Sequence, residues 1–210
     1  MSEMLVIGLT GSVAMGKSEV ASMFRRLGVA VFDADAAVDE LYRPEGAAVR
    51  YIAEAFPGCV SEQGGVDRAA LGACVLESRE EMDRLEAIVH PLVGEEKRAF
   101  LDHARREGRS MAVLDIPLLL ETNARHLVDY VVVVSASARF QRERALARPA
   151  MTQEKLDGLL ARQMPDEAKR RHADFIIDTS RNLDETFDQV RHIVATLLSE
   201  PERVSKGKCS

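Results

Sequence analysis

The sequence has few cysteines, no long apolar run and no excess of positive charge, and each absence excludes a class of protein. Its three cysteines are odd in number and form no C-x-x-C pair, which favours reduced thiols over a disulfide framework or a zinc site. No run reaches the roughly 18 apolar residues of a membrane span, and the N-terminus lacks the basic and apolar regions of an export signal. We therefore expect a cytoplasmic protein without a membrane partner.

The balance of charge excludes a further class. Lysine and arginine together number 28 and the acidic residues 34, so the net charge is −6. Non-specific binding to nucleic acid needs a broad basic surface, and we therefore expect no nucleic-acid partner. Hydrophobic residues make up 46% of the 210-residue chain, which is enough for the core of one domain with elaborations.

The most informative stretch is the octapeptide GSVAMGKS at residues 11–18, which matches the phosphate-binding pattern G-x-x-x-x-G-K-[ST]. An apolar run of strand length precedes it, and apolar residues at helical spacing follow it. The motif thus has the context that it requires, a strand that enters a glycine loop and a helix that leaves it. This context disfavours the alternative, a chance glycine turn before a helix.

The residue types of this loop explain the chemistry that we expect of it. Glycines let the backbone curl so that several N–H groups point at one anion, and the helix N-terminus adds partial positive charge. Lys17 is expected to reach the β- and γ-phosphates of ATP, and the Ser18 hydroxyl to bind Mg²⁺. The predicted nucleotide-binding residues are Gly11, Ser12, Val13, Ala14, Met15, Gly16, Lys17, Ser18 and Glu19.

Two carboxylates follow the second predicted strand, which covers residues 29–32. Ligands of open α/β sheets bind beyond the carboxyl ends of the strands. Asp33 is therefore a candidate base for a substrate hydroxyl, and Asp35 a candidate substrate contact. Each carboxylate also has a structural alternative as the cap of the next helix, and this alternative is stronger for Asp35.

Residues 36–108 lack strand patterns and are predicted to be helical. The longest predicted helix opens with a capping box at residues 78–81, and Pro91 should break or kink it. A helical segment of this length exceeds a simple crossover, so we predict an insertion that covers the substrate. His90 is a candidate substrate contact, although a histidine beside a proline is more often structural.

The strand predicted at residues 111–115 ends in Asp115. An apolar strand that ends in aspartate is typical of the Mg²⁺-supporting strand of P-loop enzymes, so we assign Asp115 to the metal site. In the apolar loop that follows, Pro117, Leu118 and Leu119 either hold a substrate ring or pack into the core. Further strands are predicted at residues 128–134 and 174–178, with a final helix after Asn182.

A basic helical stretch follows the strand at residues 128–134. Arg144 and Arg148 are four residues apart, so in one helix they share a face that suits the oxygens of a transferring phosphoryl group. A solvated helix with ordinary surface charges is the alternative. A second short helix is predicted from Thr152, and the two helices, joined by residues 149–151, form a predicted hinged lid.

Taken in order, these motifs resemble the dephospho-CoA kinase family over residues 5–198. The resemblance rests on GLTG leading into the loop, DAD at 33–35, VHP at 89–91, DIPLLLE at 115–121, Gln141 with the arginines after it, QMP at 163–165 and ADFIID at 173–178. It implies an α/β P-loop NTPase fold, a three-layer sandwich around a five-stranded parallel sheet with a helical insertion and a lid.

The resemblance also implies the reaction and the division of the chain. ATP, with Mg²⁺, would phosphorylate the ribose 3′-hydroxyl of dephospho-CoA in the last step of coenzyme A synthesis, with Asp33 as base and Lys17, Arg144 and Arg148 as catalytic groups. The implied nucleotide core comprises residues 1–35, 109–136 and 172–198, the CoA domain residues 36–108 and the lid residues 137–171. We expect a monomer with a disordered tail at residues 199–210.

Two other functions fit part of the pattern. Another small-metabolite or nucleoside monophosphate kinase would share the glycine loop, Asp33 and the lid. A non-catalytic nucleotide switch would share only the loop, and the guanine-reading N-K-x-D tetrapeptide of GTPase-like modules does not occur in the sequence.

Overall fold

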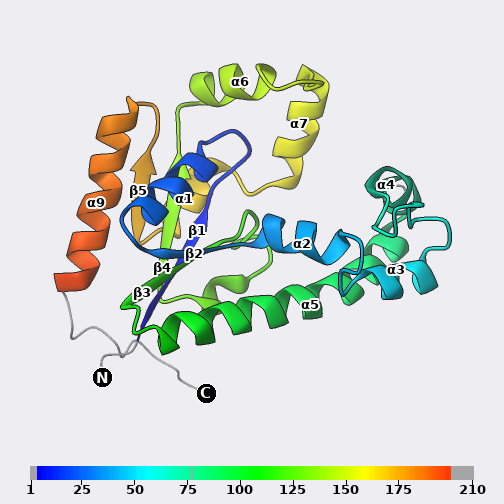
Figure 1. Cartoon of the computed structure of the whole chain (residues 1–210). Coiled ribbons are helices and arrows are strands. Elements are labelled where there is room, and N and C mark those ends of the chain that lie inside the picture. Colours follow the sequence, from blue (N-terminus) through cyan, green and yellow to red (C-terminus); the bar gives the residue numbers. More distant parts are fainter. Residues whose placement is uncertain (1–3, 77, 200–210) are drawn as a thin grey trace. The chain divides into compact units, whose positions relative to one another are not determined.

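The computed structural model describes residues 4–76 and 78–199 and contains a five-stranded sheet in the order β2-β3-β1-β4-β5 (Figure 1). β1 pairs in parallel with β3 and β4, and β4 pairs in parallel with β5. The carboxyl ends of these strands therefore share one edge, as predicted for an α/β P-loop fold. The strands are β1 (Leu5–Thr10), β2 (Ala30–Asp33), β3 (Met111–Asp115), β4 (Tyr130–Ser135) and β5 (Phe175–Asp178).

The helices follow the predicted order, with two short additions. These are α8 and the 3₁₀ turn η1 (Ala124–Leu127), which the sequence analysis does not predict because six and four residues carry little periodicity. The helices are α1 (Lys17–Arg26), α2 (Ala34–Tyr42), α3 (Val49–Ala55), α4 (Arg68–Val75), α5 (Arg79–Arg106), α6 (Ala138–Leu146), α7 (Gln153–Arg162), α8 (Asp166–Arg171) and α9 (Leu183–Ser199). Apart from Ser199, the predicted tail lies outside the described residues.

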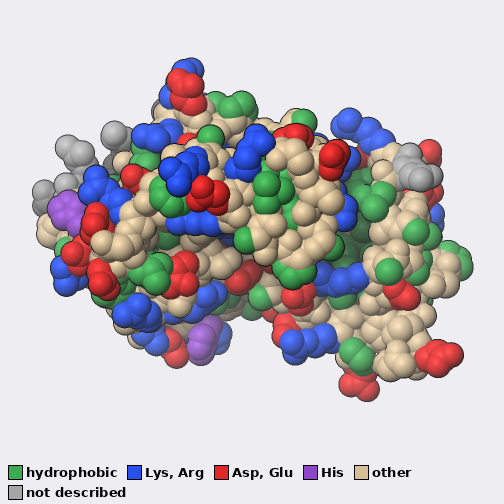
Figure 2. All heavy atoms as spheres, turned by 90° about the horizontal axis from the view of Figure 1, so that it is seen from above, with side chains coloured by type: hydrophobic (Ala, Val, Ile, Leu, Met, Phe, Trp, Pro, Cys, Tyr) green, Lys and Arg blue, Asp and Glu red, His purple; other side chains and the backbone are tan. Residues whose placement is uncertain are grey.

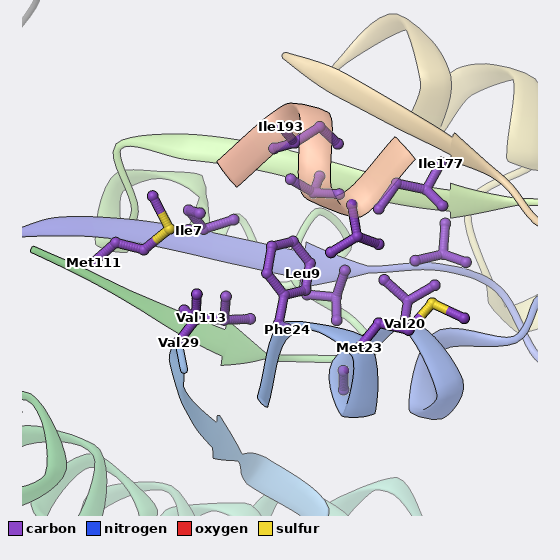
Figure 3. Packing of buried hydrophobic residues seen from close by; sticks show 14 of the residues in the cluster. Ile7, Leu9, Val20, Met23, Phe24, Val29, Met111, Val113, Ile177 and Ile193 are labelled. Carbon is purple, nitrogen blue, oxygen red and sulfur yellow. The ribbon is translucent and has the colours of Figure 1, made fainter. Parts of the chain in front are cut away.

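The chain forms two compact units, one of residues up to Val31 together with those from Ala104 onward, and one of Phe32–His103. In the first unit α1 and α9 contact each other and cover one face of the sheet (Figure 1). Phe24 of α1 is fully buried and lies beside Leu9 of β1 (Figure 3). Valines at the centre of β4 are also fully buried, as expected for a parallel strand covered on both faces.

The second unit contains α2 to α4 and most of α5 around its own core, which includes Leu41, Ile52 and Leu71. Of the predicted break or kink at Pro91, the break is wrong, because α5 is one helix of 28 residues that includes Pro91. A proline inside a helix costs about 3 kcal/mol. The apolar residues Ile88 and Leu92 on either side pack against this core and offset that cost.

The surface carries charges of both signs. On the face shown in Figure 2, lysine and arginine side chains are interspersed with acidic ones and form no broad basic surface. Among the described residues, no helix has both the length and the apolar character needed to cross a bilayer.

Glycine substitutions test the packing at the carboxyl edge of the sheet. A Cβ atom at Gly11 would lie 2.7 Å from the backbone oxygen of Val134, whereas at Gly158 of α7 it would meet nothing within 4 Å. We predict that Gly11→Ala lowers the free energy of unfolding by about 1–3 kcal/mol through overpacking. Gly158→Ala should raise it by up to about 1 kcal/mol through helix propensity. Thermal denaturation measures both, and an unchanged melting temperature for Gly11→Ala would contradict the close approach.

Candidate active site

The glycine loop leaves β1 after Thr10 and closes onto the first turn of α1. Gly16 precedes this helix with a φ of 89°, in the left-handed region that favours glycine. A Cβ atom there would also lie 3.3 Å from Oγ1 of Thr179. The first N–H groups of α1, which include those of Lys17 and Ser18, have no acceptor within the helix. The predicted phosphate-binding geometry, a curled loop that ends at a helix N-terminus, is therefore present.

Asp115 and Lys17 meet at this edge of the sheet. In the parallel register Asp115 is opposite Leu9, so the end of β3 lies beside the strand that leads into the loop. The carboxylate is only 2% exposed, and Nζ of Lys17 forms an ion pair with it. The structure thus brings a buried carboxylate, the loop lysine and the start of α1 together, as the sequence analysis predicts for a phosphate and metal site.

Two glutamines hold the backbone of Val13 within the loop. Nε2 of Gln141 in α6 donates to the Val13 oxygen at 2.9 Å, and the Val13 N–H donates to Oε1 of Gln163 at 3.0 Å. The Val13 N–H is therefore directed at a side chain rather than at the centre of the loop. Both glutamines lie within motifs, but no role was predicted for them, because neither carries charge and their partners are backbone atoms 128 and 150 residues away.

Arg144 is positioned beside the loop through Thr179. Its guanidinium donates to Oγ1 of Thr179 at 2.9 Å and to the Thr179 oxygen at 2.6 Å. Thr179 Oγ1 in turn donates to the Met15 oxygen at 2.7 Å. The prediction that Arg148 shares a helical face with Arg144 is wrong, because α6 ends at Leu146 and Arg148 lies in the exposed turn beyond it.

The apolar loop after β3 has residues in the core and residues at the surface. Leu119 is fully buried, and its Cδ2 atom fills the space that a Cβ atom of Gly8 would occupy. This supports the packing alternative for Leu119 rather than a substrate contact. Leu118 is 40% exposed, and the Pro117 oxygen accepts a hydrogen bond from Oγ1 of Thr10 at 2.9 Å. These two residues stay candidates for substrate contact.

The remaining predicted residues belong to the second unit. Asp33 ends β2 and caps α2, since its Oδ1 accepts from the Ala36 N–H at 3.0 Å. The stronger expectation of a cap at Asp35 is wrong, because α2 begins two residues earlier than that role requires and places Asp35 in its first turn. His90 lies inside α5 and is exposed.

Comparison with protein families agrees with this geometry. A family model described as Dephospho-CoA kinase matches residues 5–185. A dephospho-CoA kinase of Mesorhizobium japonicum is 54% identical over 194 residues, which cover 92% of this chain and 97% of the relative. One from Rhodopseudomonas palustris is 52% identical over 200 residues, with 95% and 99% covered.

Solved structures share the fold. A Thermus thermophilus crystal structure superposes with a TM-score of 0.81 at 29% identity and covers 94% of this chain and 99% of its own. A dephospho-CoA kinase from Campylobacter jejuni gives a TM-score of 0.64 at 20% identity, with 91% and 96% covered. At that identity the second match supports the fold alone.

Thr179 provides a test of the contacts that support the loop. Its side chain is buried and links Arg144 to Met15, so Thr179→Val keeps the shape but removes the hydroxyl that accepts from Nη1 of Arg144 and donates to the Met15 oxygen. We predict a loss of about 1–3 kcal/mol in the free energy of unfolding. Thr122→Val is the matched control, because the exposed Thr122 hydroxyl also donates to a backbone oxygen, that of Leu118 at 2.8 Å. Equal melting temperatures for the two variants would contradict a supporting role for Thr179.

Proposed function

The chain belongs to the dephospho-CoA kinase family, and we propose that it transfers the γ-phosphoryl group of ATP to the ribose 3′-hydroxyl of dephospho-CoA. The products are coenzyme A and ADP. The single observation that carries the proposal is the loop of residues 11–18 at the carboxyl edge of a parallel sheet, with Lys17 beside the buried Asp115. Within this proposal the enzyme acts as a cytoplasmic monomer, without a nucleic-acid or membrane partner.

Several groups of the loop together offset the negative charge of the phosphates. Lys17 offsets negative charge on the β- and γ-phosphates, while N–H groups at the start of α1 point at the anion. In this structure the ammonium group of Lys17 pairs with Asp115. A bound phosphate offers Lys17 a second anionic partner. When Lys17 exchanges Asp115 for the phosphate, the Asp115 carboxylate can bind a cation instead.

The residues at this edge fit Mg²⁺. Mg²⁺ takes hard oxygen ligands, often one or two carboxylates together with substrate phosphates. The Asp115 carboxylate is buried, and a buried carboxylate requires a positive partner. Ser18 and Asp115 would hold the ion, which supplies charge neutralisation for the transferring phosphoryl group when bound. Arg144, positioned through Thr179, is proposed to stabilise the same charge, with Arg148 in a supporting role from the turn after α6.

Asp33 is the proposed general base for the acceptor hydroxyl. It is the last residue of β2, and ligands of open α/β sheets bind beyond the carboxyl ends of the strands. The hydrogen bond that its Oδ1 accepts from the Ala36 N–H fixes the orientation of the carboxylate. Asp35, His90, Pro117 and Leu118 are the proposed contacts of the CoA part of the substrate.

Acceptor-dependent release of ADP tests the proposed function. We expect turnover with dephospho-CoA to exceed turnover without acceptor by orders of magnitude, and the product to carry one additional phosphoryl group by mass spectrometry. The panel should include nucleoside monophosphates and shikimate, the acceptors of other small P-loop kinases. Faster turnover with one of these than with dephospho-CoA would overturn the proposed substrate.

Lys17→Ala should lower transfer by on the order of 10²-fold or more, because one preorganised electrostatic donor is lost. The substitution also removes the ammonium partner of the buried Asp115 carboxylate, so the melting temperature should fall as well, and the assay is run well below it. Steady-state kinetics at saturating dephospho-CoA measures this loss. Activity within about threefold of wild type would contradict the role of Lys17.

Asp33→Asn separates the base from the cap. Asparagine caps helices about as well as aspartate, so the stability of α2 should be kept while the basicity is lost. We predict a fall in turnover on the order of 10²- to 10⁴-fold with nearly unchanged ATP binding. If Asp33→Asn turns over normally while Asp35→Asn is inactive, the base has been assigned to the wrong carboxylate.

A further inference from the structure

Glu121 and Lys169 form a buried ion pair that the proposed chemistry does not use. Glu121 follows the apolar loop after β3, and Lys169 lies in α8. Oε1 of Glu121 is 2.8 Å from Nζ of Lys169, whose side chain is 0% exposed. A fully buried ammonium group is stable only with a counter-charge, so this pair determines where α8 lies against the loop.

The same carboxylate also holds the segment before α8. Oε1 of Glu121 accepts a hydrogen bond from the Met164 N–H at 2.9 Å. Burial favours the neutral form of Glu121, but the ion pair with Lys169 and the Met164 N–H outweigh it and lower the pKa of the carboxyl group. Glu121 is therefore ionised at neutral pH.

The residue next to Met164 contacts the loop of residues 11–18 directly. Gln163 precedes Met164, and its Oε1 accepts from the Val13 N–H at 3.0 Å. A second contact holds the start of α8, where Oγ of Ser135 donates to Oδ2 of Asp166 at 2.7 Å. The segment from Gln163 to Lys169 is thus fixed at three points, to the loop after β3, to the end of β4 and to Val13.

We propose that Glu121 and Lys169 are positioning residues for ATP, which act through Gln163 on the conformation of the phosphate loop. Val13 is followed by Ala14, which has a φ of 61°, and by Gly16 with a φ of 89°. A loop with these left-handed residues keeps its curl only where its neighbours hold it, and Gln163 holds its N-terminal half. The inference rests on the proposed function only in that the loop binds ATP, and it does not depend on the acceptor.

A double-mutant cycle tests this action at a distance. Lys169→Met removes the buried charge and keeps most of the length of the side chain, and Gln163→Leu removes the contact with Val13. We expect Lys169→Met to raise the Kd for a fluorescent, non-hydrolysable ATP analogue by on the order of tenfold. In the Gln163→Leu background the same substitution should add less than about twofold, because its route to the loop is already broken.

Three further variants separate positioning from stability. Arg171→Met is the matched control, since Arg171 forms an ion pair with Glu167 at 2.7 Å in the same helix but is 73% exposed, and its Kd should equal that of wild type. Gln163→Glu keeps the acceptor and should retain most of the affinity. Glu121→Gln with Lys169→Met makes a neutral pair that still accepts from Met164, so it should recover affinity. If Lys169→Met does not fold, Glu121→Gln alone takes its place in the cycle.

Two outcomes would overturn the inference. Lys169→Met could melt at a lower temperature and still bind the analogue with wild-type affinity at temperatures well below its melting point, which would make the ion pair a stabilising contact only. The effects of Lys169→Met and Gln163→Leu could also multiply, which would show independent action. Because the assay measures binding without an acceptor, failure of wild type to phosphorylate dephospho-CoA would leave this inference tested and would overturn only the proposed function.

Discussion

The parallel pairing of β1 with β3 is the constraint on which the site depends. With Leu9 opposite Asp115, the strand that enters the glycine loop ends beside the strand that carries the buried carboxylate. The ion pair between Lys17 and Asp115 follows from this register, because a shift by one residue would turn the Asp115 side chain to the other face of the sheet. The valines of β4 and Phe24 of α1 maintain the register by burying both strands.

The glycine loop itself gains its conformation from its surroundings. Gly16 alone permits the left-handed turn before α1, but side chains from distant elements fix the rest. Gln141 and Gln163 hold the two backbone groups of Val13, and Thr179 holds the oxygen of Met15. These donors and acceptors come from α6, from the end of α7 and from the end of β5. Two of these side chains, Gln141 and Gln163, lie in the segment expected to form a lid, and Thr179 lies in the expected nucleotide core.

The sequence predicted the features that local patterns encode. Residues 11–18 carry their strand, loop and helix signals within a short stretch, and the apolar run that ends in Asp115 predicts both β3 and its role at the edge. The division of capping between Asp33 and Asp35 was not predictable, because α2 begins at Ala34 and a shift of one or two residues reverses the roles. Glutamines that bind a backbone 128 or more residues away leave no local pattern, and the burial of Lys169 requires a partner that the sequence does not place beside it. The acidic residues Asp166 and Glu167 in the first turn of α8 are a local start signal, although the helix is too short to show periodicity.

The central claim is that the residues brought together by β1 and β3 form the phosphate and metal site of a kinase. A crystal structure with Mg²⁺ and a non-hydrolysable ATP analogue tests it most directly. The account predicts that the β- and γ-phosphates lie in the loop of residues 11–18, that Lys17 has exchanged Asp115 for phosphate oxygens, and that the cation lies between the Ser18 hydroxyl and the Asp115 carboxylate. Phosphates bound elsewhere, or an analogue bound in the loop while Lys17 still pairs with Asp115, would contradict it.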